Sequence, residues 1–370
     1  MSVPVVCTNC RRPFPDEGLP FRCPTCGGLY DYTGPLAYDP ARVDKSRPGI
    51  WPYAHSFGLP PGAPEVTLGE GSAPLVWAAG PGERPVAYKV EGQNPTGSFK
   101  DRGSAVLVSL LRARGVTQAA EDSSGNAGAS LAAYAGRAGV RARIFVPDSA
   151  GGPKRAQIEA YGAEVVRIMG PRSNAAEAVL RAAQEGVVYA SHAYLPFLLA
   201  GYATVAYELL AQLGQTPGAV VVPAGYGNLL LGIGRGFAAL RAAGVIAQLP
   251  MLVGVQPRAC APLWAVFHYA GAGLGWVTEG DTLAEGTRIT HPLRGDAVLQ
   301  MVMESGGTFA AVDEEEILPA RDALARQGLY VEPTSAMVWS ALAQLDGQLP
   351  EPVVAVLTGS GLKTALPGSS

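Results

Sequence analysis

Lys100 is the residue whose setting most directly suggests chemistry. Turn-forming residues fill positions 94–97, an apolar strand-like run lies before them at 86–90, and an apolar helical pattern follows at 105–111. Strand, turn, lysine and helix in this order place a side chain at the carboxyl end of a strand, where α/β folds bind ligands. A lysine held nearly neutral there can form a Schiff base with an aldehyde cofactor. The alternative is a solvated lysine at a helix start.

A second candidate loop follows the strand-like run 118–122 and precedes a helical pattern at 127–138. Its sequence is Ser123-Ser124-Gly125-Asn126-Ala127-Gly128. Hydroxyls, backbone N–H groups and a helix N-terminus together can bind a carboxylate, and the Asn126 amide could donate to a cofactor oxygen. An ordinary helix N-cap is the alternative interpretation.

A glycine-containing loop comes directly after the apolar run 219–222. It reads Pro223-Ala224-Gly225-Tyr226-Gly227-Asn228-Leu229 and leads into another helical pattern. Glycines let successive N–H groups approach a phosphate, and the helix dipole adds attraction. The Lys-Ser/Thr ending of a P-loop is missing, which disfavours a nucleotidase of that class.

The last candidate loop, Thr358-Gly359-Ser360-Gly361-Leu362-Lys363, follows the final apolar run at 352–357. Thr358 could offer its hydroxyl to a ring nitrogen, and the glycines leave room for a flat ring. A simple C-terminal loop is the alternative.

Four of the five cysteines form two CxxC pairs, Cys7 with Cys10 and Cys23 with Cys26. The pairs are typical of a tetrahedral zinc ribbon, and four thiolates would leave no open position, so we expect a structural metal. Disulfides or redox thiols are the alternative, disfavoured in a reducing compartment. Cys260 is expected to be a buried free thiol.

Composition narrows the class of protein. The 370 residues are 48% hydrophobic and 16% charged, with a net charge of −3. No basic block indicates a nucleic-acid or membrane surface. The N-terminus lacks a signal-peptide pattern, and no apolar run approaches the roughly 20 residues of a spanning helix. We therefore expect a cytoplasmic protein.

Apolar strands alternate with amphipathic helices from about residue 86 onward, which predicts βαβ units and mainly parallel sheets. Strands are expected at 86–90, 118–122, 141–146, 164–168, 187–190, 219–222, 251–255 and 352–357, and helices from Asn126, Pro153, Ser173, Phe197, Asn228, Asp313 and Thr334. We expect a zinc ribbon at 1–33, a larger α/β domain at 34–104 and 200–370, and a smaller α/β domain at 105–199.

These motifs, in their order, resemble those of the fold-type II pyridoxal-phosphate enzymes, and they are most similar to the threonine synthase family. The resemblance covers roughly residues 65–365 and includes 94–102, 124–126, 225–229, 332–336 and 358–363. The segment 69–75, Gly-Glu-Gly-Ser-Ala-Pro-Leu, is similar to a substrate-side segment of that family.

The resemblance implies a role for each matching position. Lys100 would carry pyridoxal 5'-phosphate, Asn126 would bond its phenolic oxygen, and Thr358 would face the pyridine nitrogen. The phosphate would be held by Gly225, Tyr226, Gly227, Asn228 and Leu229, and the substrate carboxylate by Ser123, Ser124 and Ala127. The implied protein is a homodimeric lyase of threonine biosynthesis that converts the small amino acid O-phosphohomoserine and water to threonine and phosphate.

The chain departs from the family where a substrate phosphate must be held. Asparagine and arginine are expected at Leu195 and Leu198, and a glutamine–lysine pair at Tyr202 and Ala203. Lys154, Arg155 or His192 could hold the phosphate instead.

Alternatively, the enzyme could be a serine or threonine dehydratase, or a β-replacement enzyme on an unphosphorylated amino acid. A catalytically silent zinc-ribbon binding paralogue is the non-enzymatic possibility.

Overall fold

The computed structural model describes residues 3–364, which form two compact units. The first unit contains the described parts of Met1–Gly71, Asn94–Gly201 and Thr364–Ser370, and the second contains Ser72–Gln93 and Tyr202–Lys363. The sequence places 34–71 and 94–104 in the larger domain, whereas these residues cluster with the smaller sheet. Grouping by contacts is not a test of domain limits, so the limits expected from the sequence stay a prediction.

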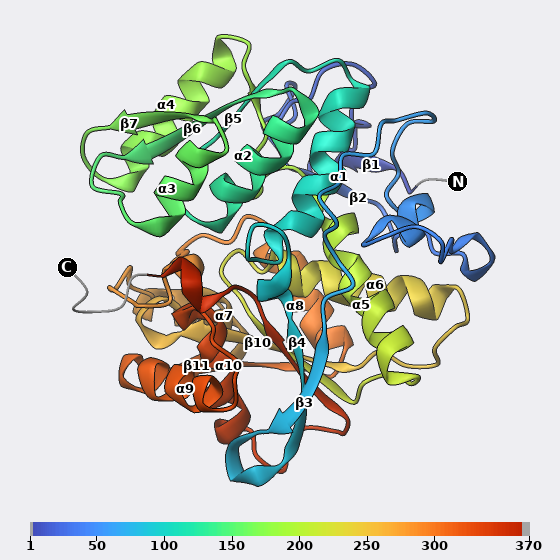
Figure 1. Ribbon diagram of the computed structural model, residues 1–370, viewed down its shortest axis with the longest axis vertical. Coiled ribbons are helices and arrows are strands. Elements are labelled where there is room, and N and C mark those ends of the chain that lie inside the picture. The colour runs from blue at the N-terminus through green and yellow to red at the C-terminus, as the bar shows by residue number, and fades with distance from the viewer. Residues whose placement is uncertain (1–2, 365–370) are drawn as a thin grey trace. The chain divides into compact units, whose positions relative to one another are not determined.

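A parallel sheet of four strands, within the described residues, organises the first unit in the order β7-β6-β5-β8. Figure 1 labels β7, β6 and β5. Its strands are β5 (Gln118–Glu121), β6 (Arg141–Pro147), β7 (Glu164–Ile168) and β8 (Val188–Tyr189). Its helices are α1 (Lys100–Ala113), α2 (Asn126–Ala138), α3 (Pro153–Ala160) and α4 (Arg172–Gln184). Right-handed crossovers place α2 and α3 on one face and α4 on the other.

The core between α4 and this sheet is built from small and aromatic side chains. Ala120, Phe145, Val179 and Tyr189 are buried together in it. Helix α2 ends at Gly139, whose φ of 67° is the left-handed conformation that a glycine adopts without steric cost. Because the helix ends at this glycine, β6 begins only two residues later, at Arg141.

The cysteine-containing N-terminus forms a small antiparallel pair, β1 (Val5–Cys7) and β2 (Tyr30–Tyr32). Two of its aromatic side chains anchor it to the first unit. Phe14 packs edge-on against Phe197 at 4.9 Å between ring centroids, and Phe21 lies 5.3 Å from both Tyr189 and Tyr194. The ribbon therefore packs on the segment that follows β8.

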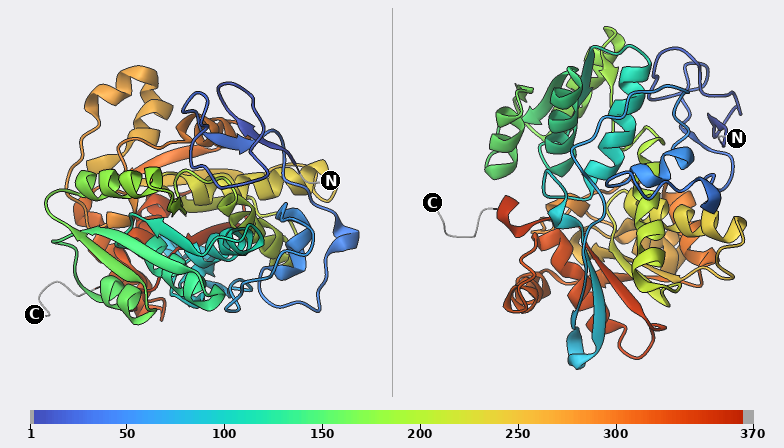
Figure 2. Two further views of the ribbon diagram at one scale, coloured as in Figure 1. Left: turned by 90° about the horizontal axis from the view of Figure 1, so that it is seen from above. Right: turned by 45° about the vertical axis from the view of Figure 1, so that its right-hand side comes forward.

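The described part of the second unit is built on a six-stranded sheet in the order β11-β10-β9-β12-β4-β3. Its strands are β3 (Leu75–Ala79), β4 (Pro85–Val90), β9 (Ala219–Pro223), β10 (Met251–Pro257), β11 (Thr308–Val312) and β12 (Val353–Leu357). Its helices are α6 (Asn228–Ala242), α7 (Pro262–Tyr269), α8 (Gly295–Glu304), α9 (Glu314–Arg326) and α10 (Pro333–Gln344), while α5 (Leu198–Leu213) begins in the first unit. Only β3 runs antiparallel to its neighbour among these strands, and Figure 2 shows the cyan β3–β4 pair beside the red β12.

A buried ion pair joins the edge of this sheet to α5. Lys89 Nζ on β4 lies 2.6 Å from Glu208 Oε2 and 2.9 Å from Gln212 Oε1. Glu208 also accepts a hydrogen bond from the Ser72 backbone N–H at 2.8 Å. The pair satisfies both buried charges, as a low-dielectric interior requires.

The α/β class and the mainly parallel sheets expected from the sequence are confirmed. Each strand expected from the sequence is present, and the expected helix starts agree to within one residue. The sequence patterns missed β3, β11, α7 and α8. Among the described residues, no helix is both long and apolar enough to cross a bilayer.

Candidate active site

Lys100 is the first residue of α1, directly after the turn-forming segment. Its side chain is half-buried, and Nζ lies 4.8 Å from the centroid of the Phe99 ring. The N-cap residue Phe99 provides no side-chain hydrogen bond to the helix. Lys100 is thus the strand–turn–helix lysine that the sequence predicts.

Asp101 ties the Lys100 turn to the neighbouring helix. Its carboxylate accepts hydrogen bonds from the Thr96 backbone N–H at 2.7 Å and the Thr96 hydroxyl at 2.6 Å. The Ser130 hydroxyl on α2 donates to the same carboxylate at 2.7 Å. Since α2 begins at Asn126, Asp101 connects the elements that carry Lys100 and Asn126.

Ser98 places a buried hydroxyl two residues before Lys100. The residue is fully buried, and within residues 3–364 its Oγ atom has no hydrogen-bond partner. Buried polar atoms are rarely left unsatisfied, so this hydroxyl fits a polar ligand group beside the lysine.

The N-terminus of α2 is suited to an anion. Its N-cap is Gly125, which offers no side-chain cap, so the first N–H groups of the helix lack that partner. A Cβ at Gly128 would overlap the Ser123 carbonyl, so glycine is needed for the helix to approach this loop. Ser123, Ser124, Asn126 and Ala127 therefore surround one helix N-terminus, as expected.

An acidic pair and a histidine lie at the carboxyl edge of the smaller sheet. Glu121 ends β5, and its Oε2 atom bonds both the backbone N–H of His192, at 3.0 Å, and its ring Nδ1, at 3.1 Å. The Tyr189 hydroxyl donates to Asp122 Oδ1 at 2.7 Å. Strands β5 and β8 are adjacent and parallel, which brings these side chains to one edge.

Burial dominates the ionisation of this cluster. It raises the pKa of Glu121, and together with the neighbouring Glu121 charge it raises the pKa of Asp122 to about 6. Burial also lowers the pKa of His192 well below its usual value, and the Lys100 charge lowers it further. A neutral His192 is a weak anion ligand near pH 7.

Glu70 secures the chain around residues 67–71 within the first unit. Its buried carboxylate accepts hydrogen bonds from Trp51 Nε1 at 2.9 Å, the Leu68 N–H at 3.0 Å and the Tyr134 hydroxyl at 2.7 Å. The next residue, Gly71, donates its N–H to Asn94 Oδ1 at 2.8 Å. Glu70 and Gly71 are therefore fixed to α2 and to the Lys100 turn, respectively.

The glycine loop of the second unit joins β9 to α6. Gly227 is the N-cap of α6 with a φ of 77°, and it provides no side-chain cap. A Cβ at Gly225 would lie 2.9 Å from the Gly286 carbonyl oxygen, so the backbones approach closely there. The loop leads into a helix N-terminus without a side-chain cap, an arrangement that suits a phosphate group.

Thr358 follows β12, the neighbour of β9 in the sheet. Because parallel strands end at the same edge, Thr358 and the loop 225–229 lie at one edge of the second unit's sheet. The Thr358 hydroxyl is 2.9 Å from Ser335 Oγ on α10. The sequence indicated Thr358 but assigned no role to Ser335.

The segment where the family holds a substrate phosphate is apolar and buried here. Leu195 and Leu198 are 1% and 3% exposed. Arg155, one substitute considered from the sequence, is already bonded to the Ala150 carbonyl oxygen at 2.9 Å and lies 3.4 Å from Glu159. Lys154 lies half-buried in the first turn of α3.

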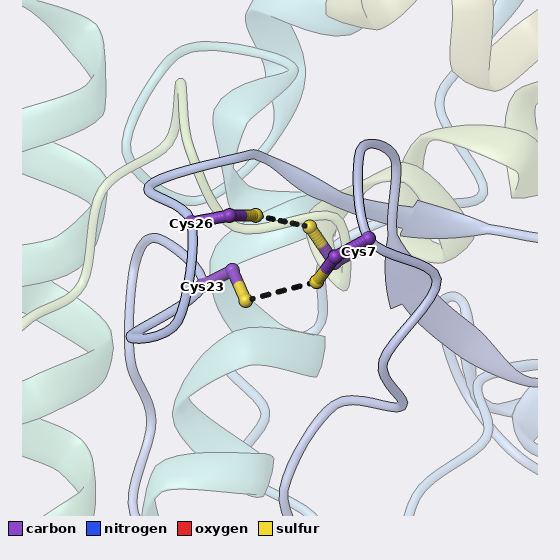
Figure 3. A group of neighbouring side chains, drawn as sticks. Cys7, Cys23 and Cys26 are labelled. Carbon is purple, nitrogen blue, oxygen red and sulfur yellow. Dashed lines mark hydrogen bonds between the residues drawn. The ribbon is translucent and has the colours of Figure 1, made fainter.

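Four cysteines cluster in the N-terminal ribbon (Figure 3). The sulfur atoms of Cys7, Cys10, Cys23 and Cys26 all lie within 4.8 Å of one another. Figure 3 labels Cys7, Cys23 and Cys26. All five cysteines are free thiols, so the disulfide alternative is not observed. Burial raises the pKa of Cys23, but the N–H groups of Thr25 and Cys26 outweigh it and lower the value to about 6. The cluster has the donor set of a closed metal site.

A family model described as pyridoxal-phosphate dependent enzyme matches residues 66–359. The chain belongs to the pyridoxal-phosphate dependent enzyme family. Within the first unit, Lys100 and the unsatisfied Ser98 hydroxyl fit the amine-reactive cofactor of this family. Within the second unit, the start of α6, which has no side-chain cap, fits an anionic group of that cofactor.

Similar members of the family include two threonine synthases. That of Methanocaldococcus jannaschii is 33% identical, over 96% of this chain and 92% of the relative. That of Methanosarcina acetivorans is 32% identical, over 96% and 91%. The similarity to these relatives therefore extends beyond the residues 66–359 that the family model matches.

Solved structures share the fold of this chain. A threonine deaminase from T.th. superposes with a TM-score of 0.65 at 29% identity, covering 80% of this chain and 94% of that one. Maize serine racemase gives a TM-score of 0.67 at 20% identity, covering 79% and 89%. The fold-type II architecture expected from the motifs is confirmed.

Proposed function

We propose that this enzyme is a pyridoxal-phosphate-dependent lyase that converts O-phosphohomoserine and water to threonine and phosphate. The observation that carries the proposal is the 33% identity to the M. jannaschii threonine synthase across nearly the full length of both chains. Structural likeness alone is a weaker guide, because one fold can support many reactions.

The cofactor supplies an aldehyde for the substrate amine and an electron sink for the carbanion. Lys100 would attach it through the side-chain amine, and Asn126 would donate to its phenolic oxygen. The backbone N–H groups of Gly225, Tyr226, Gly227, Asn228 and Leu229 would hold its phosphate. Thr358 would face its ring nitrogen with a hydroxyl.

The chain's own residues would then bind substrate and move protons. Ser123, Ser124 and Ala127 would hold the substrate carboxylate at the N-terminus of α2. The released Lys100 amine would accept the proton from Cα and serve as the general acid–base group for later transfers. The Asp101 contacts to Thr96 and Ser130 support this assignment, since they restrain the start of α1.

A second candidate, a serine or threonine dehydratase or a β-replacement enzyme, is favoured by one specific observation. Leu195 and Leu198 are buried in the segment where the family usually holds a phosphate. Such a surface cannot anchor a dianion, so a substrate without phosphate would need no substitute there.

One paired assay separates these candidates. The purified enzyme is given O-phosphohomoserine while phosphate and threonine release are followed, and serine and threonine while keto-acid release is followed. The synthase should release phosphate and threonine in equal amounts. Activity confined to the unphosphorylated amino acids would refute it in favour of the second candidate.

Lys100→Ala tests the cofactor assignment. The variant should lose the long-wavelength absorbance of covalently held cofactor and nearly all activity, whereas Lys45→Ala, at an exposed lysine, should keep both. A wild-type protein that remains colourless with added cofactor would support the catalytically silent paralogue.

We also propose that Cys7, Cys10, Cys23 and Cys26 bind a structural zinc ion. Their sulfur atoms are close enough for one tetrahedral ion. Metal analysis should find one zinc per chain. Cys7→Ser should lose it without changing the cofactor absorbance, and Cys260→Ser, at a buried thiol outside the cluster, should keep it.

The remaining expectations concern the cellular setting. We propose a cytoplasmic homodimer that acts on a small amino acid and binds no nucleic acid. Light scattering should give twice the mass of the 38.2 kDa chain, and a monomeric mass would contradict the dimer.

A further inference from the structure

Ser335 contacts Thr358 in the second unit and is not used by the mechanism above. It lies in the first turn of α10, and its Oγ atom is 2.9 Å from Thr358 Oγ1. The Gly359 backbone N–H donates to the same Ser335 oxygen at 2.9 Å. Ser335 is fully buried and Thr358 is 2% exposed, so these bonds are shielded from competing water.

The direction of the hydroxyl protons follows from the acceptors present. Ser335 has a single proton to donate, and its acceptors are Thr358 Oγ1 at 2.9 Å and the Gly359 carbonyl oxygen at 3.3 Å. That carbonyl already accepts the Glu332 N–H at 3.1 Å. Donation to the nearer acceptor, Thr358 Oγ1, is the direction that the distances favour, and it would leave the Thr358 proton for another acceptor.

We infer that Ser335 is a positioning residue that fixes the Thr358 hydroxyl as a hydrogen-bond donor toward the cofactor's ring nitrogen. The inference rests on the proposed function, which assigns Thr358 to that nitrogen. A nitrogen that accepts this bond carries no proton. Ser335 therefore helps to set the protonation state of the ring without touching it.

A purely structural role for Ser335 has a different signature. The hydroxyl also accepts the Gly359 N–H, so its removal leaves that group unsatisfied whatever residue stands at 358. Loss of this bond would weaken the protein equally in both backgrounds. Positioning through Thr358 instead requires the two substitutions to be coupled.

The test is a double-mutant cycle on cofactor binding. The full-length apoprotein is titrated with pyridoxal phosphate for the wild type, Ser335→Ala, Thr358→Ala and the double variant. Ser335→Ala should weaken binding roughly threefold to tenfold when Thr358 is present, as expected for one hydrogen bond. In the Thr358→Ala background the same change should have no further effect. Thr358→Ser, which keeps the hydroxyl, should restore the dependence on Ser335.

A second readout is independent of affinity and of activity. With 15N-labelled cofactor, the ring-nitrogen resonance of the wild type should fall at the unprotonated position at neutral pH. In Ser335→Ala it should move toward the protonated position, because Thr358 can then rotate to accept. Ser340→Ala, at another buried serine of α10, is the matched control and should leave the resonance unchanged.

The outcomes separate this inference from the proposed function. Wild-type affinity in Thr358→Ala would overturn the assignment of Thr358 itself, and the Ser335 inference with it. Weak binding in Thr358→Ala together with additive effects, or an unshifted resonance in Ser335→Ala, would overturn only the role of Ser335. Melting of each apoprotein checks that the variants are folded.

Discussion

Asp101 supports the reactive lysine by fixing the turn that carries it. A lysine amine reacts only if the turn that carries it holds a fixed geometry, and Asp101 supplies that restraint through Thr96 and Ser130. Its charge, buried among hydrogen-bond donors, is satisfied by these bonds. The carboxylate therefore acts on the site through the backbone around Lys100.

Asp101→Asn should destabilise the protein and loosen the lysine turn. The amide replaces one carboxylate oxygen by NH2, so it either faces the Thr96 N–H with a donor or loses the oxygen that accepts from the Thr96 and Ser130 hydroxyls. We expect this to cost about 2–4 kcal/mol of unfolding free energy. Chemical denaturation of the apoprotein measures the loss, and cofactor absorbance reports the site. Asp148→Asn, at an exposed aspartate of the same unit, is the control. Equal stability of both variants would contradict the restraining role.

Asp122 makes a pH-dependent contribution to stability. Its pKa of about 6 in the folded protein lies above the ordinary value of 3.8, because of burial and the Glu121 charge. The folded state therefore binds its proton more tightly than the unfolded state, and the associated stability is lost as pH rises through about 6.

Asp122→Asn should therefore be more stable than the wild type at pH 8, by up to about 2–3 kcal/mol. Asparagine still accepts from Tyr189, and burial keeps the pKa of His192 well below 6.5, so its ring is neutral at pH 8. The advantage should shrink as the pH falls through about 6 and disappear only below the ordinary carboxyl pKa of 3.8, at roughly pH 3 and lower, where Asp122 is protonated in both states. Unfolding curves at pH 8 and at roughly pH 3 measure it, and an equal difference at both would be inconsistent with the raised pKa.

At the level of elements, the ribbon packs on the segment that departs most from the family. Phe21 contacts Tyr189 and Tyr194, and Phe14 contacts Phe197. The segment that carries His192, Leu195 and Leu198 is thereby held between aromatic contacts and the first unit's core. Its apolar character suits packing, which explains the buried leucines in physical terms.

Phe21→Ala should release this packing without emptying the metal site. Truncation of an aromatic side chain at such a contact should cost about 1–3 kcal/mol, and zinc content should stay at one per chain. Thermal melting and metal analysis provide the two measurements. Met169→Ala, at a side chain 76% exposed in the same unit, should leave the melting temperature unchanged. A loss of zinc in Phe21→Ala would instead make the aromatic contact part of the metal site's own support.

Sequence patterns predicted the strands and helices that combine strong periodicity with adjacent turn residues. They missed elements such as β3, whose structure depends on the strand beside it in the sheet. Lys100, Asn126 and the loop 225–229 follow apolar strands and begin helices, so their places could be read directly. The sequence did not predict strand β3 because its residues show no alternation of buried and exposed side chains. Four of them are half-buried, and Trp77 is exposed, at the antiparallel edge of the sheet. The roles of Asp101 and Ser335 depend on partners 29 and 23 residues away, which spacing alone does not indicate.

At the scale of the whole molecule, each unit is assembled from separate stretches of chain. The chain leaves the first unit after Gly71, returns at Asn94 and leaves again after Gly201. Strand β12, near the end of the chain, lies between β9 and β4 in the sheet of the second unit. The centre of the larger sheet is therefore its last strand in sequence.

This order has a consequence for folding during synthesis. The strands and helices of the first unit's sheet are complete once Gly201 has left the ribosome, whereas β4 must wait for β12 with only the antiparallel β3 beside it. A two-stranded ribbon is marginal in water, so the nascent second unit should remain open until the last strand emerges. Chains arrested at residue 350 should resist protease over 94–201 and be cleaved within 219–345, while full-length chains should resist over both. Protection of 219–345 in the arrested chain would show that the sheet can close without its central strand.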